Sequence, residues 1–521
     1  MRPHPSPDMT QPERTAMSRH PSSRSAPRHR FRRSGIALVA VGGLILAACG
    51  SPPTSGGDGG GREASGDGDR ELPECPLDAL EKADGPVEID LWYGGLGGET
   101  QTTMEEMASG FNASQDEVVV KANNQGQSYE EVLRKYEGAS ATPNQLPQVI
   151  YLEDTTLGQM VDKGQVLPAE ACMEAADYDP TQILPAARSA FSVDDVLYPG
   201  YMNVSTPILY YNKTIFAKAG LDPDDPPGTM EEVREAAKTI KDAGLADKPL
   251  SFKVNRWFLE NWLSGVGQDL VNNDNGRSEP ATEAAFNTPE AVDLLTELQE
   301  MNDEGLLNAF ASTEGSIDHF LALVPPANGN PSSAMLVETS TASTTISAVV
   351  EGQITAAEAG IDFDESVVDK SAIVPGAGPY PGLEAPGKVN AGGGGFFILN
   401  TASDEQQAAS WKFLEFMLQP ENAKTWHTKG GYLPIVKSVL DEPDVQEYWE
   451  TTLSGVLVKP SVDQLRDADP DQSGPLIGPY VPVTDAVQGA MERVLLNGAD
   501  PQTELDKAES EVDKVFDDYN R

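Results

Sequence analysis

The chain has 521 residues, of which 39% are hydrophobic and 23% are charged, and its formal net charge is −45. A chain of this length is predicted to form two or three lobes, because a single core stops growing at about 250–300 residues. The whole chain has 37 Lys and Arg and 82 Asp and Glu residues, and the segment from Met1 to Ala48 contains eight of the Arg and two of the acids. The remainder of the chain therefore carries 29 basic and 80 acidic residues, which is a net charge of −51. This charge argues against nucleic acid as a partner and against electrostatic binding to anionic lipid.

The first 48 residues are typical of an export signal. Four Arg precede an apolar run, Gly35–Ala48, whose ~14 residues are fewer than the ~20 that span a bilayer as a helix. The run ends in Leu46-Ala47-Ala48-Cys49, which resembles the lipobox of bacterial lipoproteins. That likeness implies lipid on Cys49, and an ordinary signal peptide with an incidental Cys is the alternative. The start codon (Met1 or Met17) and the export route (general secretory or twin-arginine) stay open.

Residues 49–85 are predicted to be a lipidated Cys followed by a flexible tether, because Gly, Ser, Pro and Asp dominate up to residue 70. Cys75 and Cys172 remain, and a pair of Cys in an exported protein predicts a disulfide. It would close a loop of ~97 residues and stabilise the fold by roughly 4–5 kcal/mol in the chain-entropy model. Two free buried thiols are the alternative.

From Pro86 onward the sequence alternates between strand and helix patterns, which predicts a layered α/β body. Strands are predicted at 87–92, 117–121, 147–152, 198–203, 207–211, 333–338 and 396–399. Helices are predicted at 99–111, 128–136, 154–163, 229–243, 288–301, 404–418, 420–429, 482–496 and 502–519. The continuous apolar run at 147–152 is typical of a parallel strand that is buried on both faces.

The chain after Cys49 is poor in catalytic motifs. It contains two His, His319 and His427, which are too few for a His-based zinc site. There is no HExxH, GxSxG or phosphate-binding GxxxxGK[ST] motif, and the glycine run Gly392–Gly395 precedes a predicted strand instead of following one. We therefore expect no metal, no cofactor and no enzymatic activity. A pair of carboxylates of the kind used by glycoside hydrolases stays open among so many acids.

Aromatic residues mark a candidate ligand site. Trp92 and Tyr93 stand where the first predicted strand ends, and the carboxyl ends of parallel strands face the ligand crevice in open α/β sheets. Trp257 lies on a predicted helix beside Arg256 and Glu260. Because sugars stack their apolar faces on aromatic rings, these side chains favour a carbohydrate ligand. The alternative is that each Trp belongs to the core.

Three segments resemble the family 1 extracellular solute-binding proteins of ABC importers, and in particular the glycerol-3-phosphate-binding members of that family. They are PILYYNKTIFAKAGLDPDDPP at 207–227, FNTPEAVDLLTELQEMNDEGL at 286–306 and WKFLEFMLQPENAKTWHTKGGYLPI at 411–435. The resemblance extends roughly from Pro86 to the end. It implies an α/β, two-lobed periplasmic-binding-protein-like fold of type II, in which hinge strands join the lobes and the ligand lies in the cleft.

The resemblance also implies where the lobes and hinges lie. We expect the first lobe at 86–203 plus 394–437 and the second at 204–393 plus 438–521. The hinge crossings are expected at 203–206 and 392–395, because glycine absorbs backbone rotation.

The ligand contacts of the glycerol-3-phosphate-binding members can be carried over one position at a time. The matching positions are Tyr129, Asp154 with Glu153 beside it, Ser205, Thr339 or Ser340, Gly393 and Tyr432. One position differs from the glycerol-3-phosphate-binding members. They hold phosphate with an arginine at the position where this chain has Thr484. Without a guanidinium a phosphate loses a charge-assisted partner. A neutral sugar or oligosaccharide is therefore favoured, and a glycerophosphodiester or glycerol phosphate, held by Arg256, is the alternative.

The function that the resemblance implies is that of a monomeric substrate-binding lipoprotein. Lipid on Cys49 would hold it to the extracytoplasmic face of the cell membrane, where it would deliver a carbohydrate to ABC permease subunits. Two other hypotheses stay open: a lipid-anchored glycoside hydrolase, and a sensor or adhesion lipoprotein with the same fold.

Overall fold

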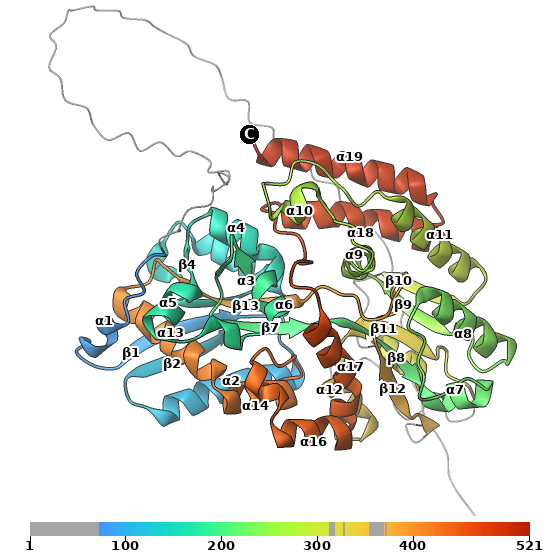
Figure 1. Cartoon of the computed structure of the whole chain (residues 1–521), viewed down its shortest axis with the longest axis horizontal. Helices are drawn as coiled ribbons and strands as arrows, with labels where there is room; N and C mark the ends of the chain where they lie inside the picture. The colour runs from blue at the N-terminus through green and yellow to red at the C-terminus, as the bar shows by residue number, and fades with distance from the viewer. Residues whose placement is uncertain (1–71, 312–317, 327–328, 354–368, 370–371) are drawn as a thin grey trace, which may run out of the picture. The chain divides into compact units, whose positions relative to one another are not determined.

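A computed structural model describes residues 72–311, 318–326, 329–353, 369 and 372–521 (Figure 1). The predicted export signal, Cys49 and the tether up to residue 71 lie outside these described residues. In the described part of the chain, no helix combines the length and the apolar composition that crossing a membrane requires.

The first of two large sheets is built mainly from the N-terminal part of the chain. Its strands are β2 (Val118–Asn124), β1 (Val87–Tyr93), β3 (Val149–Glu153), β13 (Gly392–Leu399) and β4 (Val166–Leu167) in spatial order, with β7 (Tyr201–Ser205) also paired to β13. β2, β1 and β3 are parallel, whereas β13 runs antiparallel to β3, β4 and β7. The carboxyl ends of β1 and β3 therefore lie at the same edge of this sheet.

The second large sheet comes from the middle of the chain. Its strands are β10 (Leu307–Ala311), β9 (Leu250–Val254), β11 (Met335–Thr339), β8 (Pro207–Asn212) and β12 (Pro375–Gly378) in spatial order. β10, β9 and β11 are parallel, and β8 runs antiparallel to both β11 and β12. A short hairpin of β5 (Ser192–Val193) and β6 (Val196–Leu197) lies apart from both sheets.

Both faces of each large sheet are buried. In β3, Val149 and Tyr151 belong to one hydrophobic cluster, whereas Ile150 and Leu152 belong to another. β8 divides its side chains between two clusters in the same way. Because successive strand residues point to opposite faces, each sheet is a middle layer with helices packed on both sides. The continuous apolar run predicted as a buried strand is thus confirmed.

The helices surround these two sheets (Figure 1). In the described residues they are α1 (Asp78–Glu81), α2 (Gly98–Ser114), α3 (Tyr129–Ala139), α4 (Leu157–Asp162), α5 (Ala169–Ala175), α6 (Pro185–Ala190), α7 (Lys213–Ala219), α8 (Met230–Asp242), α9 (Arg256–Ser264), α10 (Asn272–Gly276), α11 (Pro289–Asp303), α12 (Ala342–Val350), α13 (Asp404–Leu418), α14 (Pro420–Gly430), α15 (Lys437–Leu440), α16 (Pro443–Thr451), α17 (Leu453–Asp467), α18 (Tyr480–Asn497) and α19 (Pro501–Tyr519).

Several helix starts follow from local chemistry. The Ser128 side chain accepts the N–H of Glu131 at the start of α3, and Thr229 forms a complete capping box with Glu232 at the start of α8. Each cap satisfies backbone donors that the first turn of a helix leaves free. The predicted helix at 154–163 differs, because Asp154–Thr156 form a 3₁₀ turn before α4 begins. That turn places Asp154 directly at the end of β3.

The two sheets are joined by strands, and the two-lobed fold is confirmed. β7 of the first sheet leads through Thr206 into β8 of the second, and β13 returns the chain to the first sheet. The glycine run at 392–395 is the first half of β13 and pairs with β7, so the strand is longer than the predicted 396–399. The predicted lobe bounds stay a prediction. Val445 and Trp449 of α16, which fall in the range expected for the second lobe, pack in the hydrophobic cluster of the first sheet.

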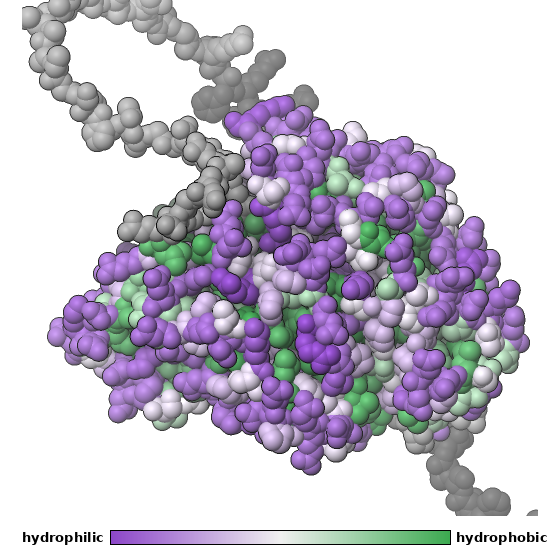
Figure 2. All heavy atoms as spheres, viewed as in Figure 1, coloured by the Kyte–Doolittle hydropathy of each residue, from purple (hydrophilic) through white to green (hydrophobic). Residues whose placement is uncertain are grey.

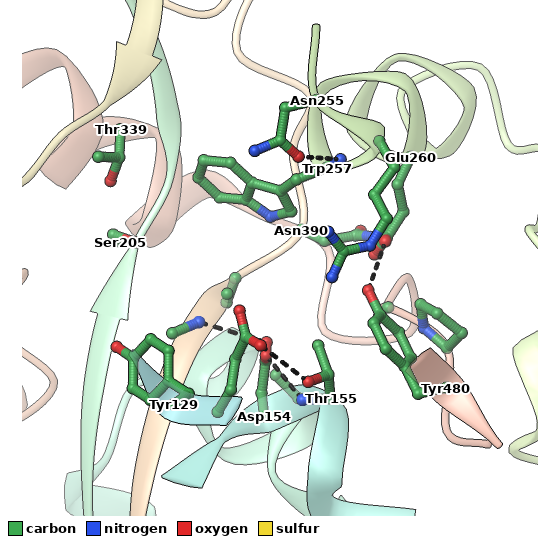
Figure 3. Close-up of a pocket in the computed structure, with 18 of the residues that line it drawn as sticks. Tyr129, Asp154, Thr155, Ser205, Asn255, Trp257, Glu260, Thr339, Asn390 and Tyr480 are labelled. Atoms are coloured by element: carbon green, nitrogen blue, oxygen red, sulfur yellow. Dashed lines mark hydrogen bonds between the residues drawn. The ribbon is translucent and has the colours of Figure 1, made fainter. Parts of the chain in front are cut away.

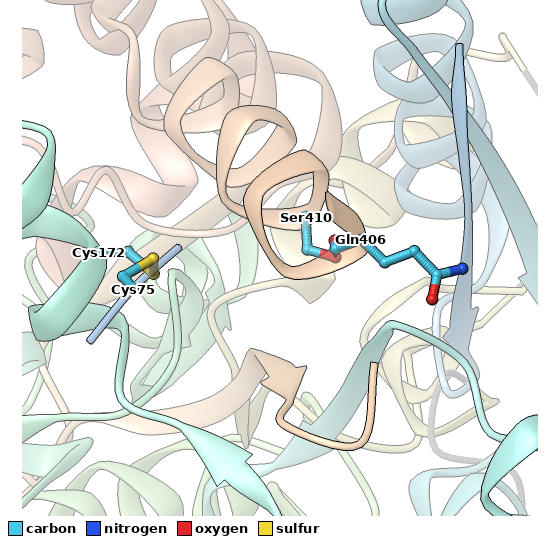
Figure 4. The surroundings of a disulfide bond; sticks show 4 residues. All are labelled: Cys75, Cys172, Gln406 and Ser410. Carbon is cyan, nitrogen blue, oxygen red and sulfur yellow. Dashed lines mark hydrogen bonds between the residues drawn. A yellow bond between two sulfur atoms is a disulfide. The ribbon is translucent and has the colours of Figure 1, made fainter. Parts of the chain in front are cut away.

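A disulfide joins Cys75 to Cys172 of α5, as the pairing of the two Cys predicted (Figure 4). The two Cα atoms are 5.0 Å apart and 97 residues apart in sequence. Both Cys are buried in the hydrophobic cluster of the first sheet. The bond therefore fixes the segment that leads from the tether to the body of the first lobe.

Candidate functional site

A cavity of about 310 Å³ is lined by residues from both lobes. Glu153, Asp154 and Gly393 come from the edge of the first sheet, and Trp257 and Glu260 come from α9 beside the second sheet. Figure 3 shows Tyr129 and Asp154 on one side of the space and the indole of Trp257 on the other. The carboxyl edge of β3 and the start of α9 thus face the same small volume.

Asp154 anchors the first-lobe side of the cavity. Its carboxylate accepts the N–H of Thr155 at 2.8 Å and the N–H of Gly393 at 3.3 Å. Burial raises the pKa of Asp154 well above its usual range, and the nearby Glu153 and Glu260 raise it further. Burial also raises the pKa of Glu153, against the opposing effect of Arg256. A carboxyl with a raised pKa keeps its proton to higher pH, and a protonated carboxyl can donate a hydrogen bond as well as accept one.

Glu260, Tyr480 and Arg256 form a polar group on the second-lobe side. The hydroxyl of Tyr480 donates to Glu260 Oε2 at 3.2 Å (Figure 3), and the Arg256 guanidinium carbon lies 5.7 Å from the centre of the Tyr480 ring. Burial raises the pKa of Glu260 to about 7, although Arg256 and the hydrogen bond from Tyr480 oppose the rise. Burial lowers the pKa of Arg256, but Tyr480, Glu153 and Glu260 outweigh it and the net shift is upward. Arg256 is therefore a charged group inside the cavity.

The Trp257 ring is placed by two local features. The Asn255 side chain caps α9 by accepting the N–H of Trp257 at 2.9 Å (Figure 3). A Cβ added to Gly392 would lie 3.0 Å from Trp257 Nε1, so a glycine at this position lets the indole approach β13. The neighbouring Gly393 has a φ of +146°, and a Cβ there would lie 1.8 Å from the carbonyl oxygen of Asn203. The two glycines of the β13 start thus allow close packing around the cavity.

A chain of tyrosine hydroxyls continues from the cavity into the first lobe. The Tyr129 hydroxyl lies 2.9 Å from that of Tyr151 and 3.3 Å from that of Tyr432. Asn203 Nδ2 donates to the Tyr151 hydroxyl at 2.9 Å. The Tyr432 ring stacks on Trp426 with centroids 6.1 Å apart and planes 7° apart. The hydroxyls of Tyr129 and Tyr432 are therefore held in fixed positions at the cavity wall.

His427 supports the backbone of Tyr432. Its Nδ1 lies 2.7 Å from the Tyr432 carbonyl oxygen, and Trp449 Nε1 donates to its Nε2 at 2.8 Å. Because Nε2 accepts, Nδ1 carries the proton and donates. Burial lowers the pKa of His427 to about 4, so the ring is neutral at pH 7. This histidine holds a binding-site tyrosine and does not itself line the cavity.

Comparison with known proteins decides the family. The family described as bacterial extracellular solute-binding protein matches residues 106–452, which is more than half of the chain. The chain belongs to this family. It is a solute-binding protein of the kind that serves ABC importers, and the resemblance noted in the sequence is confirmed.

One relative is similar in sequence over most of its length, and two solved structures share the fold. The sn-glycerol-3-phosphate-binding periplasmic protein UgpB of Escherichia coli (strain K12) is 27% identical over 444 residues, covering 83% of this chain and 93% of its own length. UgpB from Mycobacterium tuberculosis in complex with glycerophosphocholine is similar with a TM-score of 0.66 and 20% identity, over 84% of this chain and all of that one. The cyclic alpha-maltosyl-1,6-maltose binding protein from Arthrobacter globiformis gives 0.62 and 24%, over 83% of this chain and all of that one.

Most of the predicted ligand contacts of this solute-binding protein lie together at the cavity. Those in its lining are Tyr129, Glu153, Asp154, Ser205, Trp257, Thr339, Gly393 and Tyr432. Trp92, Tyr93 and Ser340 lie outside the lining. Tyr93 is buried in the first-lobe cluster with its hydroxyl donating to Glu105, and Trp92, on the opposite face of β1, packs against a smaller cluster. Ser340 is buried, and its Oγ accepts the N–H of Thr206.

Other lining residues were not among the predicted contacts. The lining also includes Thr155, Asn255, Glu260, Arg277, Glu338, Thr341, Asn390 and Tyr480. Thr484, the position where the arginine is replaced, is buried in α18, and its hydroxyl donates to the Tyr480 carbonyl at 3.0 Å. Tyr480 lies four residues earlier on the same helix. The sequence therefore indicated the correct helix but not the residue that lines the cavity. Among the described residues, no group of three or more His, Cys, Asp or Glu side chains is placed to hold a metal ion.

Proposed function

We propose that this solute-binding protein captures a neutral sugar or oligosaccharide in the cavity between its lobes and delivers it, unchanged, to ABC permease subunits. The observation that carries the proposal is the indole of Trp257 facing Tyr129 and Asp154 across the cavity (Figure 3). An aromatic face opposite hydrogen-bonding groups suits a ring that has apolar C–H faces and polar edges.

The individual contacts can be assigned from the geometry. The Trp257 indole offers a stacking face, and the buried carboxyls of Glu153, Asp154 and Glu260 offer acceptors and, when protonated, donors. Sugar hydroxyls both donate and accept, so they can use carboxyls in either state. A ligand that touches Trp257 and Asp154 at once favours the closed arrangement of the lobes over an open one. The ratio of its affinities for the two arrangements sets how far it shifts the equilibrium between them.

The cell-surface part of the proposal rests on the sequence and the family. The match to an extracellular family supports a place outside the cytoplasm, and the lipobox-like segment supports lipid on Cys49. The exposed surface also suits a solvated body, since hydrophilic residues cover most of the face shown in Figure 2. A lipid anchor would keep the protein, as a monomer, near its permease.

A glycerophosphodiester is the second candidate ligand, and one observation favours it. Arg256 lies in the cavity lining with a raised pKa, so it offers a permanent cation for a phosphate group. The M. tuberculosis structure with glycerophosphocholine supports the same candidate. Against it, Glu153 and Glu260 lie near Arg256, and Asp154 lines the same cavity, so these carboxyls would repel an anion whenever they are ionised.

A calorimetric panel tests the proposal. The protein is titrated with glucose, maltose, maltotriose, glycerol 3-phosphate and glycerophosphocholine at pH 7, and the Trp257→Ala variant serves as the comparison. We expect a saccharide to bind with a Kd that Trp257→Ala raises. Binding of glycerophosphocholine alone would contradict the carbohydrate assignment. New reducing ends after incubation with maltotriose would contradict the non-enzymatic role and favour a hydrolase.

A further inference from the structure

A second cavity adjoins the first. It has a volume of about 540 Å³. The two share the lining residues Gly95, Glu338, Thr339, Thr341 and Tyr432. Because these residues belong to both linings, the two spaces meet at a common wall. A molecule that reached from one space into the other would pass Tyr432.

The second cavity has a different lining from the first. Hydroxyl groups come from Thr100 and Thr102 of α2 and from Thr345 of α12, and Gly95, Gly97 and Gly98, which have no side chain, add backbone atoms. Among the described residues, the aromatic side chain in this lining is that of Tyr432, which also lines the first cavity. The hydroxyls of Thr100 and Thr102 donate to backbone carbonyls of Gly430 and Gly98, so they offer acceptors to the space. The first cavity instead presents an indole and a cluster of buried carboxyls.

The strongly charged groups of the second cavity compensate each other. Lys253 of β9 donates to Glu338 Oε2 of β11 at 2.9 Å, and the two side chains are only 10% and 9% exposed. A buried pair of this kind keeps its charges local, because each ion is stabilised by the other and either alone would be costly to bury. Glu99 is the remaining charged residue of the lining, and it is exposed. No net positive charge faces the space, so it is poorly suited to an anionic group.

We infer that the second cavity is a subsite for an uncharged polyhydroxyl group, and that the solute is therefore a saccharide of at least two units extended along both cavities. The inference rests on the proposed carbohydrate-binding function and narrows its substrate class. One unit would occupy the space between Trp257 and Asp154. The next would pass Tyr432 and place its hydroxyls against Thr341 and Thr345. A monosaccharide or glycerol phosphate would leave the second cavity to water.

A chain-length series tests the inference. Glucose and its α-1,4 and β-1,4 oligomers of two to four units are titrated calorimetrically into the wild-type protein and into Thr345→Phe, which adds bulk to the second cavity only. We expect the wild-type Kd to fall about tenfold or more from glucose to the best longer oligomer. Thr345→Phe should lose that gain, so that its Kd for the oligomer approaches the wild-type value for glucose.

Two further variants keep the result interpretable. Thr451→Phe adds the same ring at an exposed position of α16 outside both cavities, and it should bind like the wild type. Gly97→Phe is a second filling variant if Thr345→Phe unfolds, since a Cβ at Gly97 meets no atom within 4 Å. A wild-type protein that binds glucose as tightly as every oligomer would overturn the inference alone. Binding of glycerophosphocholine with no binding of any saccharide would overturn the proposed function and, with it, the inference.

Discussion

The guanidinium of Arg277 donates to the carbonyl oxygen of Ser189, 3.3 Å from its Nη1. It also donates to the carbonyl oxygens of Ala190 at 3.3 Å and Gly474 at 2.8 Å. Ser189 and Ala190 end α6, which packs in the first-lobe cluster, whereas Arg277 follows α10 beside the second-lobe cluster. One side chain at the cavity wall therefore links the two lobes.

Replacing Arg277 should loosen that link. Arg277→Ala is expected to lower the free energy of unfolding by about 1–3 kcal/mol, because carbonyl oxygens at the lobe contact lose their donor. The radius of gyration of the ligand-free protein, measured by small-angle X-ray scattering, should increase. Arg466→Ala removes an exposed arginine that pairs with exposed acids on α17, and it should change neither quantity. Arg277→Ala with wild-type scattering would show that the contact does not hold the lobes together.

The sequence predicted the fold better than the site. Long periodic segments with their own caps, such as the helix that Thr229 opens, were placed within a residue or two. The strands β10 and β12 were missed because they are short and lack a strong period-2 pattern, whereas β9 was missed although Leu250–Val254 alternates apolar and polar residues. At the site, most of the residues carried over from the family line the same cavity. Tyr93 does not, since it lies on the same face of β1 as Ile89 and Leu91, which the period-2 alternation of the strand places in the core.

The aromatic residues of the cavity should separate binding from stability. Trp257→Ala and Tyr432→Ala are each expected to weaken saccharide binding by about tenfold or more, because each removes a ring face or hydroxyl from the wall. Trp257→Ala should change the melting temperature little, because this ring is only partly buried, whereas Tyr432→Ala should also lower it, because Tyr432 is buried in the first-lobe cluster and stacks on Trp426. Trp262, one turn further along α9, is the contrast, because it is buried with its Nε1 donating to the Pro381 carbonyl. Trp262→Ala should lower the free energy of unfolding by about 3–5 kcal/mol. Unaltered saccharide affinity in Trp257→Ala and Tyr432→Ala would show that these two residues do not belong to the binding site.

The disulfide should contribute to stability in the exported protein. Replacing both Cys75 and Cys172 by Ser is expected to lower the free energy of unfolding by about 2–5 kcal/mol, because the unfolded chain regains the freedom of a 97-residue separation. Urea denaturation of the variant and of the wild type measures the difference. Treatment with a reducing agent should lower the wild-type stability toward that of the variant and leave the variant unchanged. Equal stability of the oxidised wild type and the double variant would contradict a structural role.

The burial of Glu260 makes a prediction about pH. Its pKa rises from 4.5 to about 7 in the folded protein, first through burial, whereas the unfolded chain titrates near 4.5. Between these values the folded state holds more protons than the unfolded state, so the contribution of Glu260 to stability falls as pH rises through that window. Above pH 7 the ionised, buried carboxylate costs the fold about 3 kcal/mol.

The Glu260→Gln variant removes this titration while keeping a side-chain oxygen that can accept the hydrogen bond from Tyr480. Urea unfolding is measured for the variant and the wild type at intervals from pH 4 to pH 8. The stability of the variant relative to the wild type should increase by about 3 kcal/mol across the range, since groups far from Glu260 titrate alike in both proteins and cancel in the difference. The loss of the Glu260 charge also removes one cause of the raised pKa of Asp154, which acts in the same direction. Glu511→Gln, at an exposed position of α19, should give a flat difference. A flat difference for Glu260→Gln as well would mean that this carboxyl ionises near its ordinary pKa, and hence that water or a rearranged Arg256 solvates it in the folded protein.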